Sequence, residues 1–344
     1  MGLTNSPFTI GKLTHGQKNL ITDVPGVLVG HVTLHEGENI RTGVSCIKPH
    51  PGNLFCDKVM AASYVFNGYG KTAGLVQINE LGTIETPIVL TNTLSVGTAM
   101  TAMVRYMMEQ NPEIGGSAGT VNTVVGECND GTLNDIRGLH VTEAHVRAAI
   151  DACADTFEEG AVGAGTGMCC LGFKGGIGSS SRVVSVGQKN YTVGALVLAN
   201  FGSRGRLMID GRQVGREIAE RDNAADQGSI IMIIATDAPL CTRQLGRVAK
   251  RAGVGLSRTG SYMGNGSGDV AIAFTTANRV PHASDCAVLH YEMLSDGYID
   301  PIFDATAEAV EEAIVSALWH ADTTTGKGGV TINGLYQAYE AMNS

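Results

Sequence analysis

Unbroken apolar runs, rather than alternating ones, mark the central strands that we predict for this chain. Six apolar residues, 230–235, follow the pair Gly228-Ser229 without a polar interruption. Such a run is typical of a strand whose two faces are both covered. The preceding residues, 221–227, are polar and have no apolar period, which predicts an exposed connection. The pattern therefore places Gly228 and Ser229 where a solvent-facing loop enters a buried strand.

The other elements are predicted from short apolar runs and from apolar residues at helical spacing. We expect strands at 27–32, 43–47, 193–199 and 270–274, and a strand-like run that begins at residue 123. We expect helices at 96–109, 142–156, 242–252, 305–319 and 334–342. Ser95 is predicted to cap the first of these helices and Gly253 to end the third. Because no linker divides the sequence and no repeat recurs at a fixed period, we expect a single α/β domain over residues 1–344.

Polar side chains stand at the ends of several predicted strands. They are Glu127 after the run that begins at residue 123, Asn200 after the strand at 193–199, and Ser267 and Asp269 before the strand at 270–274. Binding sites tend to lie at such strand ends. The neighbouring Asn129-Asp130-Gly131 fits either a binding site or an ordinary turn.

The Gly228-Ser229 step allows a particular chemistry. Glycine tolerates strained backbone angles and puts no side chain in the way, so the serine hydroxyl could attack the preceding carbonyl. Hydrolysis of the resulting ester would leave Ser229 as a new N-terminus. Its α-amine, with an ordinary pKa of about 7.7–8.0, could then act as the base for its own hydroxyl. A tight loop before a core strand explains the same two residues, and their spacing alone leaves both interpretations open.

Composition excludes several classes of function. The net charge is −9 over 344 residues, the basic residues are scattered and aromatic residues make up 5%, which argues against nucleic acid as a partner. No apolar run reaches the roughly 18 residues that span a bilayer, and the first twenty residues lack the order of a secretion signal. We therefore expect a cytoplasmic protein that does not bind membranes, with its eight cysteines as buried thiols.

No pattern indicates a cofactor or a metal ion. The glycines of 163–167 lack the third glycine of a dinucleotide-binding fingerprint, and 173–182 is no Walker A loop, so we expect a structural hairpin there. The spacing of His31, His35, His50 and Cys56 fits no strong zinc pattern. Met100, Met103 and Met107 recur on one helical face, which is typical of core packing.

Seven segments, in order along nearly the whole chain, carry a resemblance to a known family. They are DVPGVLVGH, NELGTIETPIVLTNT, VVGECNDGTLNDIRGLHV, FKGGIGSSSR, LVLANFG, GSIIMIIATDAPL and GSGDVAIAF. Together they resemble the DmpA-type L-aminopeptidase D-amidase/D-esterase family, which includes the β-peptidyl aminopeptidases. The resemblance implies a four-layered α/β/β/α sandwich that is similar to the Ntn-hydrolase fold but differs in connectivity. It also implies self-cleavage into an α chain, 1–228, and a β chain, 229–344, in a homotetramer.

The same resemblance implies a role for each catalytic residue. Ser229 matches the nucleophile, and Asn200 matches an asparagine whose side-chain amide contributes to the oxyanion hole. Ser267 and Asp269 match a serine and an acid that orient the nucleophile and its amine. Some relatives have a glutamate in place of Asp269, so the carboxylate reaches less far in this chain.

Substrate binding is implied at two further positions. Glu127 matches a carboxylate that holds the free ammonium group of the substrate. Relatives often carry an aromatic residue where this chain has Asn129, whose backbone amide could still serve an oxyanion while the contacts of its side chain differ. The resemblance thus implies an aminopeptidase that needs no cofactor and releases N-terminal residues from small peptides, amides or esters, including D-alanine or β-amino-acid derivatives in some members.

Two other functions remain open at this point. Acyltransferases of the ornithine acetyltransferase type resemble this fold and also cleave themselves, but they use a threonine nucleophile, so a serine at position 229 counts against this class. The chain could also be an unprocessed binding or scaffold protein that keeps the fold without the chemistry.

Overall fold

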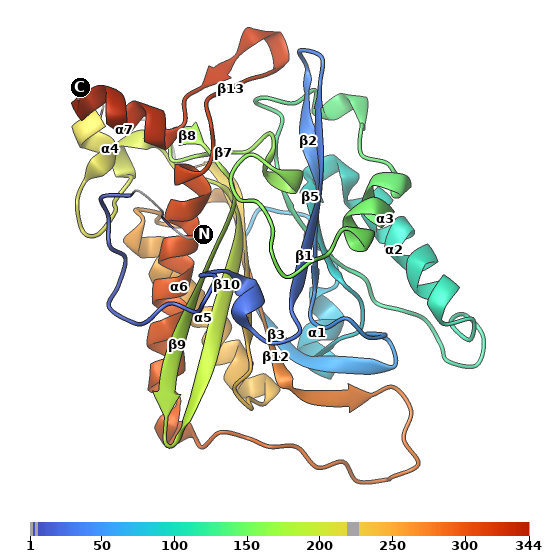
Figure 1. The fold of residues 1–344 in the computed structure, drawn as a ribbon. Coiled ribbons are helices and arrows are strands. Elements are labelled where there is room, and N and C mark those ends of the chain that lie inside the picture. The colour runs from blue at the N-terminus through green and yellow to red at the C-terminus, as the bar shows by residue number, and fades with distance from the viewer. Residues whose placement is uncertain (1–2, 4–5, 219–226, 344) are drawn as a thin grey trace.

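Two β-sheets form the centre of the molecule in the computed structural model, which describes residues 3, 6–218 and 227–343 (Figure 1). The larger sheet has the strand order β4-β3-β12-β11-β10-β9. Its strands are β3 (Asp57–Gly68), β4 (Thr83–Ile84), β9 (Gly176–Val186), β10 (Lys189–Asn200), β11 (Gln227–Thr236) and β12 (Gly266–Pro281). Strands β11 and β12 are parallel to each other, and every other pair of adjacent strands in this sheet is antiparallel. Of the connection predicted at 221–227, residues 221–226 lie outside the described residues, and Gln227 already belongs to β11.

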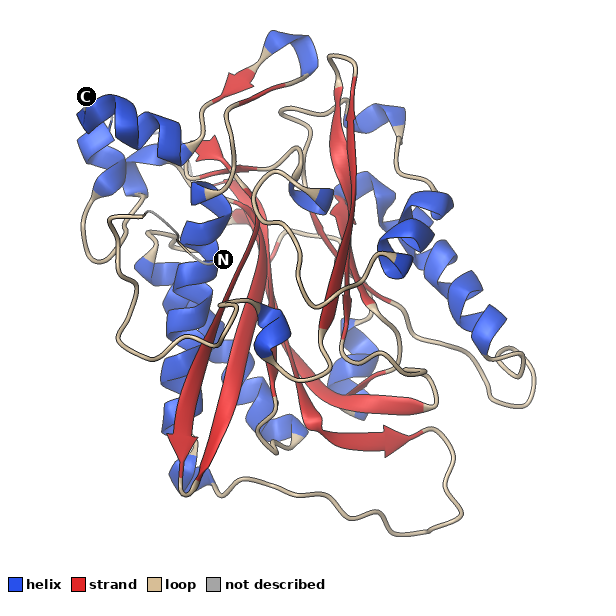
Figure 2. Cartoon of the chain, viewed as in Figure 1, coloured by secondary structure: helices blue, strands red, loops and turns tan. Residues whose placement is uncertain are grey.

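The smaller sheet has the order β1-β2-β5-β6. Its strands are β1 (Leu28–Glu36), β2 (Ile40–Lys48), β5 (Ile88–Asn92) and β6 (Val124–Cys128), of which β5 and β6 are parallel. Helices α2 (Val96–Gln110) and α3 (Glu143–Asp151) cover its outer face, and α5 (Thr242–Arg258) and α6 (Asp300–Trp319) cover the outer face of the larger sheet (Figures 1 and 2). The four layers that the resemblance implied are therefore present.

The apolar run after Ser229 is buried on both faces, as its pattern predicts. Ile231 and Ile233 of β11 belong to the core between the two sheets, whereas Ile230, Met232 and Ile234 pack toward α5 and α6. Because side chains alternate between the faces of a strand, a strand in the middle of four layers needs apolar residues at every position.

Short elements complete the chain. They are α1 (Leu75–Leu81), α4 (Val214–Ile218), α7 (Leu335–Asn343), the pair β7 (Cys169–Cys170) and β8 (Phe173–Lys174), the pair β13 (Thr324–Thr325) and β14 (Thr331–Ile332), and 3-10 turns at Ile21–Asp23, Thr93–Ser95, Ile136–Gly138, Gly163–Gly165, Arg204–Arg206, Asp296–Tyr298 and Lys327–Gly329. No described helix is both long and apolar enough to cross a bilayer. The cysteines form no disulfide within the described residues. Cys46, Cys128 and Cys170 are buried as expected, whereas the others are partly or fully exposed, namely Cys153, Cys169 and Cys241 partly and Cys56 and Cys286 fully.

Two helix boundaries differ from the prediction for reasons of tertiary packing. Helix α5 continues past Gly253 to Arg258, so this glycine lies inside the helix and does not end it. A Cβ at Gly253 would lie 2.4 Å from the Phe66 ring. Helix α3 ends at Asp151 rather than 156, because Ala154 forms a pair of backbone hydrogen bonds with Val29 of β1.

The starts of two other helices also differ. Helix α6 begins at Asp300 rather than 305, with Pro301 in its first turn, where the missing N–H of proline is no loss. Ser95 does not cap α2 with its side chain. Instead, the side chain of Asn92, at the end of β5, accepts hydrogen bonds from the N–H groups of Leu94 and Ser95.

Residues 173–182 are not a hairpin of their own. Strand β8 pairs with β7, and β9 continues to Val186 before it turns into β10. Within the methionine stripe, Met103 and Met107 are buried as expected, whereas Met100 is 37% exposed.

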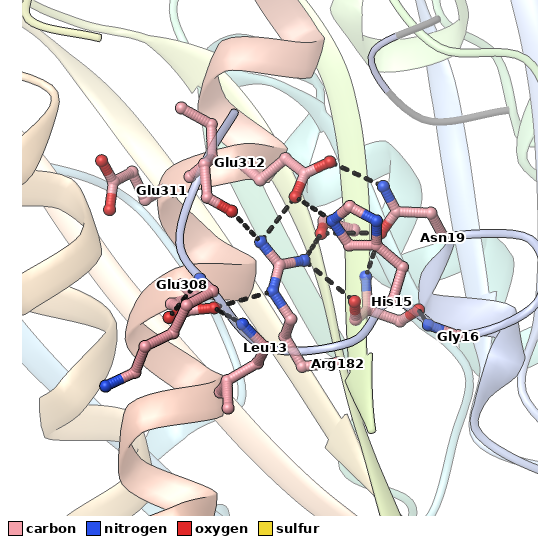
Figure 3. A network of polar contacts seen from close by, with 12 residues as sticks. Leu13, His15, Gly16, Asn19, Arg182, Glu308, Glu311 and Glu312 are labelled. Atoms are coloured by element: carbon pink, nitrogen blue, oxygen red, sulfur yellow. Dashed lines mark hydrogen bonds and ion pairs between the residues drawn. The ribbon is translucent and has the colours of Figure 1, made fainter. Parts of the chain in front are cut away.

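A buried arginine of β9 joins the N-terminal segment to α6 (Figure 3). The Arg182 side chain is fully buried and forms ion pairs with Glu308 (Nε–Oε2, 3.0 Å) and Glu312 (Nη2–Oε2, 2.5 Å). Glu308 also accepts from the N–H groups of residues 12 and 13, and Glu312 contacts the side chains of His15 and Asn19. This network connects three segments that are far apart in the sequence.

Candidate active site

Gly228 and Ser229 lie at the beginning of β11, in a geometry that only glycine fits. Gly228 has φ +126°, and a Cβ there would lie 1.9 Å from the Asn200 carbonyl oxygen. Ser229 is buried, and its Oγ donates a hydrogen bond to the Gly228 carbonyl oxygen at 2.6 Å. The hydroxyl therefore contacts the peptide group that it would have to attack.

Asn200 ends β10 directly beside this serine. The antiparallel register of β10 and β11 pairs Asn200 with Ser229. The amide of Asn200 is held at both ends, because Oδ1 accepts from the Cys169 N–H at 2.9 Å and Nδ2 donates to the Asn129 carbonyl at 3.1 Å. A side-chain amide fixed in this way is suited to stabilise negative charge on a reacting oxygen.

Ser267 and Asp269 approach from the strand on the other side. They lie inside β12, not before it as the sequence predicted, and they flank Gly268, which pairs with Ser229 in the parallel register. Both side chains are buried, and the Ser267 Oγ donates to the Asp269 Oδ1 at 2.7 Å. A Cβ at Gly268 would lie 3.0 Å from the Ser229 Oγ, so a small residue keeps this approach open.

Glu127 belongs to the other sheet. It is the fourth residue of β6 rather than a residue after a strand, and it is buried. Its Oε1 accepts from the Lys71 backbone N–H at 2.7 Å, and its Oε2 accepts a short hydrogen bond from the Thr93 hydroxyl. Both donors are neutral, so these contacts orient the carboxylate without cancelling its charge.

One cavity brings residues of both sheets together. Its volume is about 270 Å³, and it is lined by Tyr69, Lys71, Thr93, Glu127, Asn129, Gly228, Ser229 and Gly266. The candidate nucleophile and the candidate ammonium-binding carboxylate thus face the same space, which is of a size for a small ligand. Asn200, Ser267 and Asp269 are not among the lining residues, but Asn200 donates to the Asn129 carbonyl and pairs with Ser229, and Ser267 and Asp269 flank the glycine that pairs with Ser229.

Four lining residues were not predicted as site residues, namely Tyr69, Lys71, Thr93 and Gly266. Tyr69 and Lys71 follow β3 in a glycine-rich turn, and Thr93 follows β5, so each stands at a strand end like the residues that were found. Strand β3 was not predicted from the sequence, because asparagine and glycine residues interrupt the apolar pattern at the end of this strand and after it. The Lys71 ammonium lies 5.3 Å from the centre of the Tyr69 ring.

Two buried charged groups neighbour residues of the site: Asp130 follows Asn129 in the chain, and Lys174 contacts the peptide group that donates to Asn200. Burial raises the pKa of Asp130 to about 6 and lowers the pKa of Lys174 to about 8. The Nζ of Lys174 donates to the carbonyls of Gly165, Met168 and Gly175. Within the described residues, no three histidine, cysteine, aspartate or glutamate side chains gather in a way that could hold a metal ion.

A sequence model of peptidase family S58 matches residues 19–332. The chain belongs to this family. "Beta-peptidyl aminopeptidase BapA" of Sphingosinicella microcystinivorans is 40% identical over 94% of this chain and 87% of the relative. The family assignment agrees with the resemblance drawn from the seven sequence segments.

Two solved structures share the S58 fold over nearly their whole length. The PH0078 protein from Pyrococcus horikoshii OT3 has a TM-score of 0.95 and 53% identity and covers 100% of this chain and 98% of its own. The L-aminopeptidase D-Ala-esterase/amidase from Ochrobactrum anthropi, whose structure is described as a new variant among the Ntn hydrolase fold, has a TM-score of 0.89 and 39% identity, covering 96% and 95%. This S58 protein is therefore a hydrolase of the aminopeptidase class with an Ntn-hydrolase-like fold.

Proposed function

We propose that this protein cleaves itself between Gly228 and Ser229 and then acts as an aminopeptidase whose nucleophile is the N-terminal serine of the new β chain. The single observation that carries the proposal is the contact between the Ser229 Oγ and the Gly228 carbonyl, at 2.6 Å. It occurs at the edge of a cavity that also holds the Glu127 carboxylate. The contact supports a role for this hydroxyl in self-cleavage, and its position on the cavity lining supports a role in attack on a bound substrate.

In the self-cleavage step, the Ser229 Oγ bonds to the carbonyl carbon of Gly228 and the peptide C–N bond breaks. The hydroxyl proton passes to the nitrogen that leaves, which becomes the α-amine of Ser229. One water molecule then hydrolyses the ester and gives the carboxylate of Gly228 and a restored hydroxyl. Glycine adopts the positive φ of Gly228 readily, and the absence of a Cβ leaves no side chain beside the carbonyl that the hydroxyl attacks.

In the hydrolytic cycle, the free amine of Ser229 takes the hydroxyl proton while Oγ attacks the carbonyl carbon of the substrate's first residue. The Nδ2 group of Asn200 donates to the oxyanion, a contribution that is typically worth about 2.7–4 kcal/mol in acyl transfer. The amine then returns the proton to the leaving group. Water releases the acyl group and regenerates Ser229. Ser267 and Asp269 orient the Ser229 hydroxyl and its amine.

The substrate class follows from the charge of the cavity. Glu127 is buried with neutral donors, so a substrate ammonium group would be its counter-ion, and the enzyme would then require a free N-terminus in its substrates. The small cavity favours short peptides, aminoacyl amides and esters. The named relatives motivate β-amino-acid and D-alanine derivatives as the first compounds to test.

We further propose that the cleaved αβ units associate with one another. Large apolar side chains are exposed on the segment between β12 and α6, including Val288, Met293 and Tyr298, which are 68%, 59% and 58% exposed. A second copy of the chain would cover such residues. Light scattering of the purified protein should show an oligomer, and a monomer would contradict this part of the proposal.

The test of the proposed function is the intact mass of purified wild type and of Ser229→Ala. We expect two fragments with a boundary between Gly228 and Ser229 in the wild type and one full-length chain in the variant. Ser185→Ala, an exposed serine of β9, is the matched control and should be cut like the wild type. A cut and active Ser229→Ala variant would refute the proposal.

Activity assays separate the alternative functions. We expect hydrolysis of L-alanyl, D-alanyl or β-alanyl amides by the wild type and much slower hydrolysis of their N-acetylated forms, which lack the ammonium group. Net acyl transfer to an added amine, without hydrolysis, would indicate an acyltransferase instead. An uncut chain that stays inactive on prolonged incubation would indicate a protein without this chemistry.

A further inference from the structure

A buried lysine contacts the peptide group that donates a hydrogen bond to Asn200. The Lys174 side chain of β8 is fully buried. Its Nζ donates to three main-chain carbonyls, those of Gly165 (2.9 Å), Met168 (2.8 Å) and Gly175 (2.7 Å). These three bonds use all three hydrogens of the ammonium group. Burial of a cation is costly, so its placement here calls for a reason beyond packing.

One of these carbonyls connects Lys174 to Asn200. The Met168 carbonyl and the Cys169 N–H belong to the same peptide group, and that N–H donates to the Asn200 Oδ1 at 2.9 Å. The Asn200 Nδ2 carries two hydrogens, one of which goes to the Asn129 carbonyl at 3.1 Å. An unbroken series of hydrogen bonds therefore runs from the ammonium group through two amides to the proposed oxyanion donor.

The two amides in this series transmit the charge of the lysine. When the oxygen of an amide accepts a strong hydrogen bond, electron density moves toward that oxygen, and the N–H of the same amide becomes a better donor. Hydrogen bonds in such a series strengthen one another, by perhaps 10–30% per bond. A cation at the head of the series makes its first bond charge-assisted, and such bonds are roughly twice as strong as neutral ones.

We propose that Lys174 is a positioning residue for the oxyanion hole: through the peptide between Met168 and Cys169, its ammonium group fixes the Asn200 amide and strengthens it as a donor. This inference rests on the proposed function, in which Asn200 stabilises the oxyanion. Lys174 does not touch the substrate, because its side chain is fully buried and main-chain carbonyls take all three of its ammonium hydrogens. Its contribution should appear in the transition state, where the oxyanion forms, and not in substrate binding.

The test is a double-mutant cycle with Lys174→Met and Asn200→Ala, with rates expressed per active site titrated. Asn200→Ala should lower kcat by about 10²–10³-fold, as is typical for the loss of one oxyanion-hole donor. Lys174→Met should lower kcat by about 10–50-fold and leave KM within about threefold. In the Asn200→Ala background, the lysine substitution should then cost less than about twofold, because the group through which it acts is gone.

If the fold-losses in kcat of the two single variants multiply in the double variant, the inference is overturned, because Lys174 then acts independently of Asn200. An unchanged kcat with a lowered melting temperature would overturn it too, by assigning Lys174 to stability alone. Lys58→Met is the matched control: Lys58 is a largely buried lysine paired with Glu85 at 2.5 Å, outside the cavity lining, and its loss should lower the melting temperature and leave kcat unchanged. If Lys174→Met is not cut, the rate of self-cleavage replaces kcat in the same cycle, because that step also forms an oxyanion.

A second measurement covers the case in which Lys174→Met does not fold. With burial lowering the pKa of Lys174 to about 8, the wild-type kcat should fall as the pH rises above that value and the ammonium loses its proton. Cys169, Cys170 and Asp130 are the titratable groups that face Lys174, and each would favour its charged form. The Ser229 amine has the opposite effect, because it must be deprotonated to act as a base. A kcat that stays constant or rises from pH 8 to pH 10 would contradict the inference.

The proposed function and this inference fail in different ways. If the wild type is not cut, or if Asn200→Ala is fully active, the proposed function is wrong. If the wild type is cut and Asn200→Ala is impaired, but the cycle shows no coupling between the two residues, only the role of Lys174 is wrong.

Discussion

Replacement of Arg182 by methionine should destabilise the fold strongly, because it leaves two buried carboxylates without their cation. The Glu308 and Glu312 side chains are 4% and 3% exposed, and their ion pairs with Arg182 are 3.0 and 2.5 Å long (Figure 3). Methionine fills much of the same space but provides no donor. The variant therefore tests the charge more than the packing.

The expected loss follows from what each carboxylate keeps. Removal of one partner from a buried ion pair costs about 3–5 kcal/mol in the free energy of unfolding. Glu308 retains two backbone donors, at Lys12 and Leu13, and Glu312 retains the His15 and Asn19 side chains. Because these contacts remain, we expect the free energy of unfolding to fall by about 3 kcal/mol, the lower end of that range.

Urea unfolding in the Ser229→Ala background is the appropriate assay, because an uncut chain has no second fragment that must reassociate on refolding. With a slope of about 3 kcal/mol per molar urea, the midpoint should fall by about 1 M. Arg147→Met is the control: this exposed arginine pairs with Glu109 and Asp151 on the surface, where such pairs contribute at most about 1 kcal/mol. A loss below about 1 kcal/mol for Arg182→Met would refute the reasoning, whereas partial recovery on adding Glu308→Gln and Glu312→Gln would support it.

The same variant should change the pH dependence of stability. Burial alone would raise the pKa of Glu308 and Glu312, but their hydrogen bonds and Arg182 outweigh it and lower both pKa values. As the pH falls below the ordinary carboxyl pKa, these two groups bind protons in the unfolded chain before they do so in the folded protein. The stability that they contribute to the wild type is therefore present above about pH 4.5 and is lost as the pH falls. Without Arg182, burial should dominate and raise these pKa values. The deficit of Arg182→Met should consequently be smaller at pH 4.5 than at pH 7.

Two further predictions concern the site. Gly228→Ala should abolish self-cleavage, because its Cβ would lie 1.9 Å from the Asn200 carbonyl oxygen and its φ is +126°; the intact mass should show one chain, and cutting at the wild-type rate would contradict this. Asp130→Asn should raise the melting temperature of the Ser229→Ala protein at pH 7.5. Burial raises the pKa of Asp130 to about 6, so the ionised carboxylate destabilises the fold. This loss of stability develops as the pH rises from about 4 through 6. The shift corresponds to about 3 kcal/mol at neutral pH. At pH 4, where the native Asp130 is protonated, the gain should vanish; an equal gain at both pH values would show that charge is not the cause.

Local pattern was sufficient to find the elements of the core and much of the candidate site. The apolar run after Ser229 identified a strand covered on both faces, because burial on two sides demands apolar residues at every position. Glu127, Asn129 and Ser229 were all found at predicted strand ends, and they line one cavity. The roles assigned to them came from the family resemblance, since neither a strand end nor a glycine-serine step specifies a reaction by itself.

Tertiary structure decided what the local pattern left open. Gly253 has the sequence signature of a helix end, yet α5 runs through it, and a glycine stands there because the Phe66 ring of β3 occupies the space of a Cβ. Tyr69 and Lys71 join the cavity only because antiparallel pairing of β3 with β12 carries the end of β3 to the start of β12.

Lys174 shows the limit most clearly. In the sequence it is a lysine in a glycine-rich segment, for which an exposed position would be the ordinary expectation. In the fold it is fully buried, and its ammonium group is surrounded by carbonyls of a turn that also orients Asn200. The sequence alone determined which residues could form strands and which could react. Contacts between segments distant in the chain determined which polar groups meet in the interior, because burial and hydrogen bonding depend on neighbours that local periodicity does not encode.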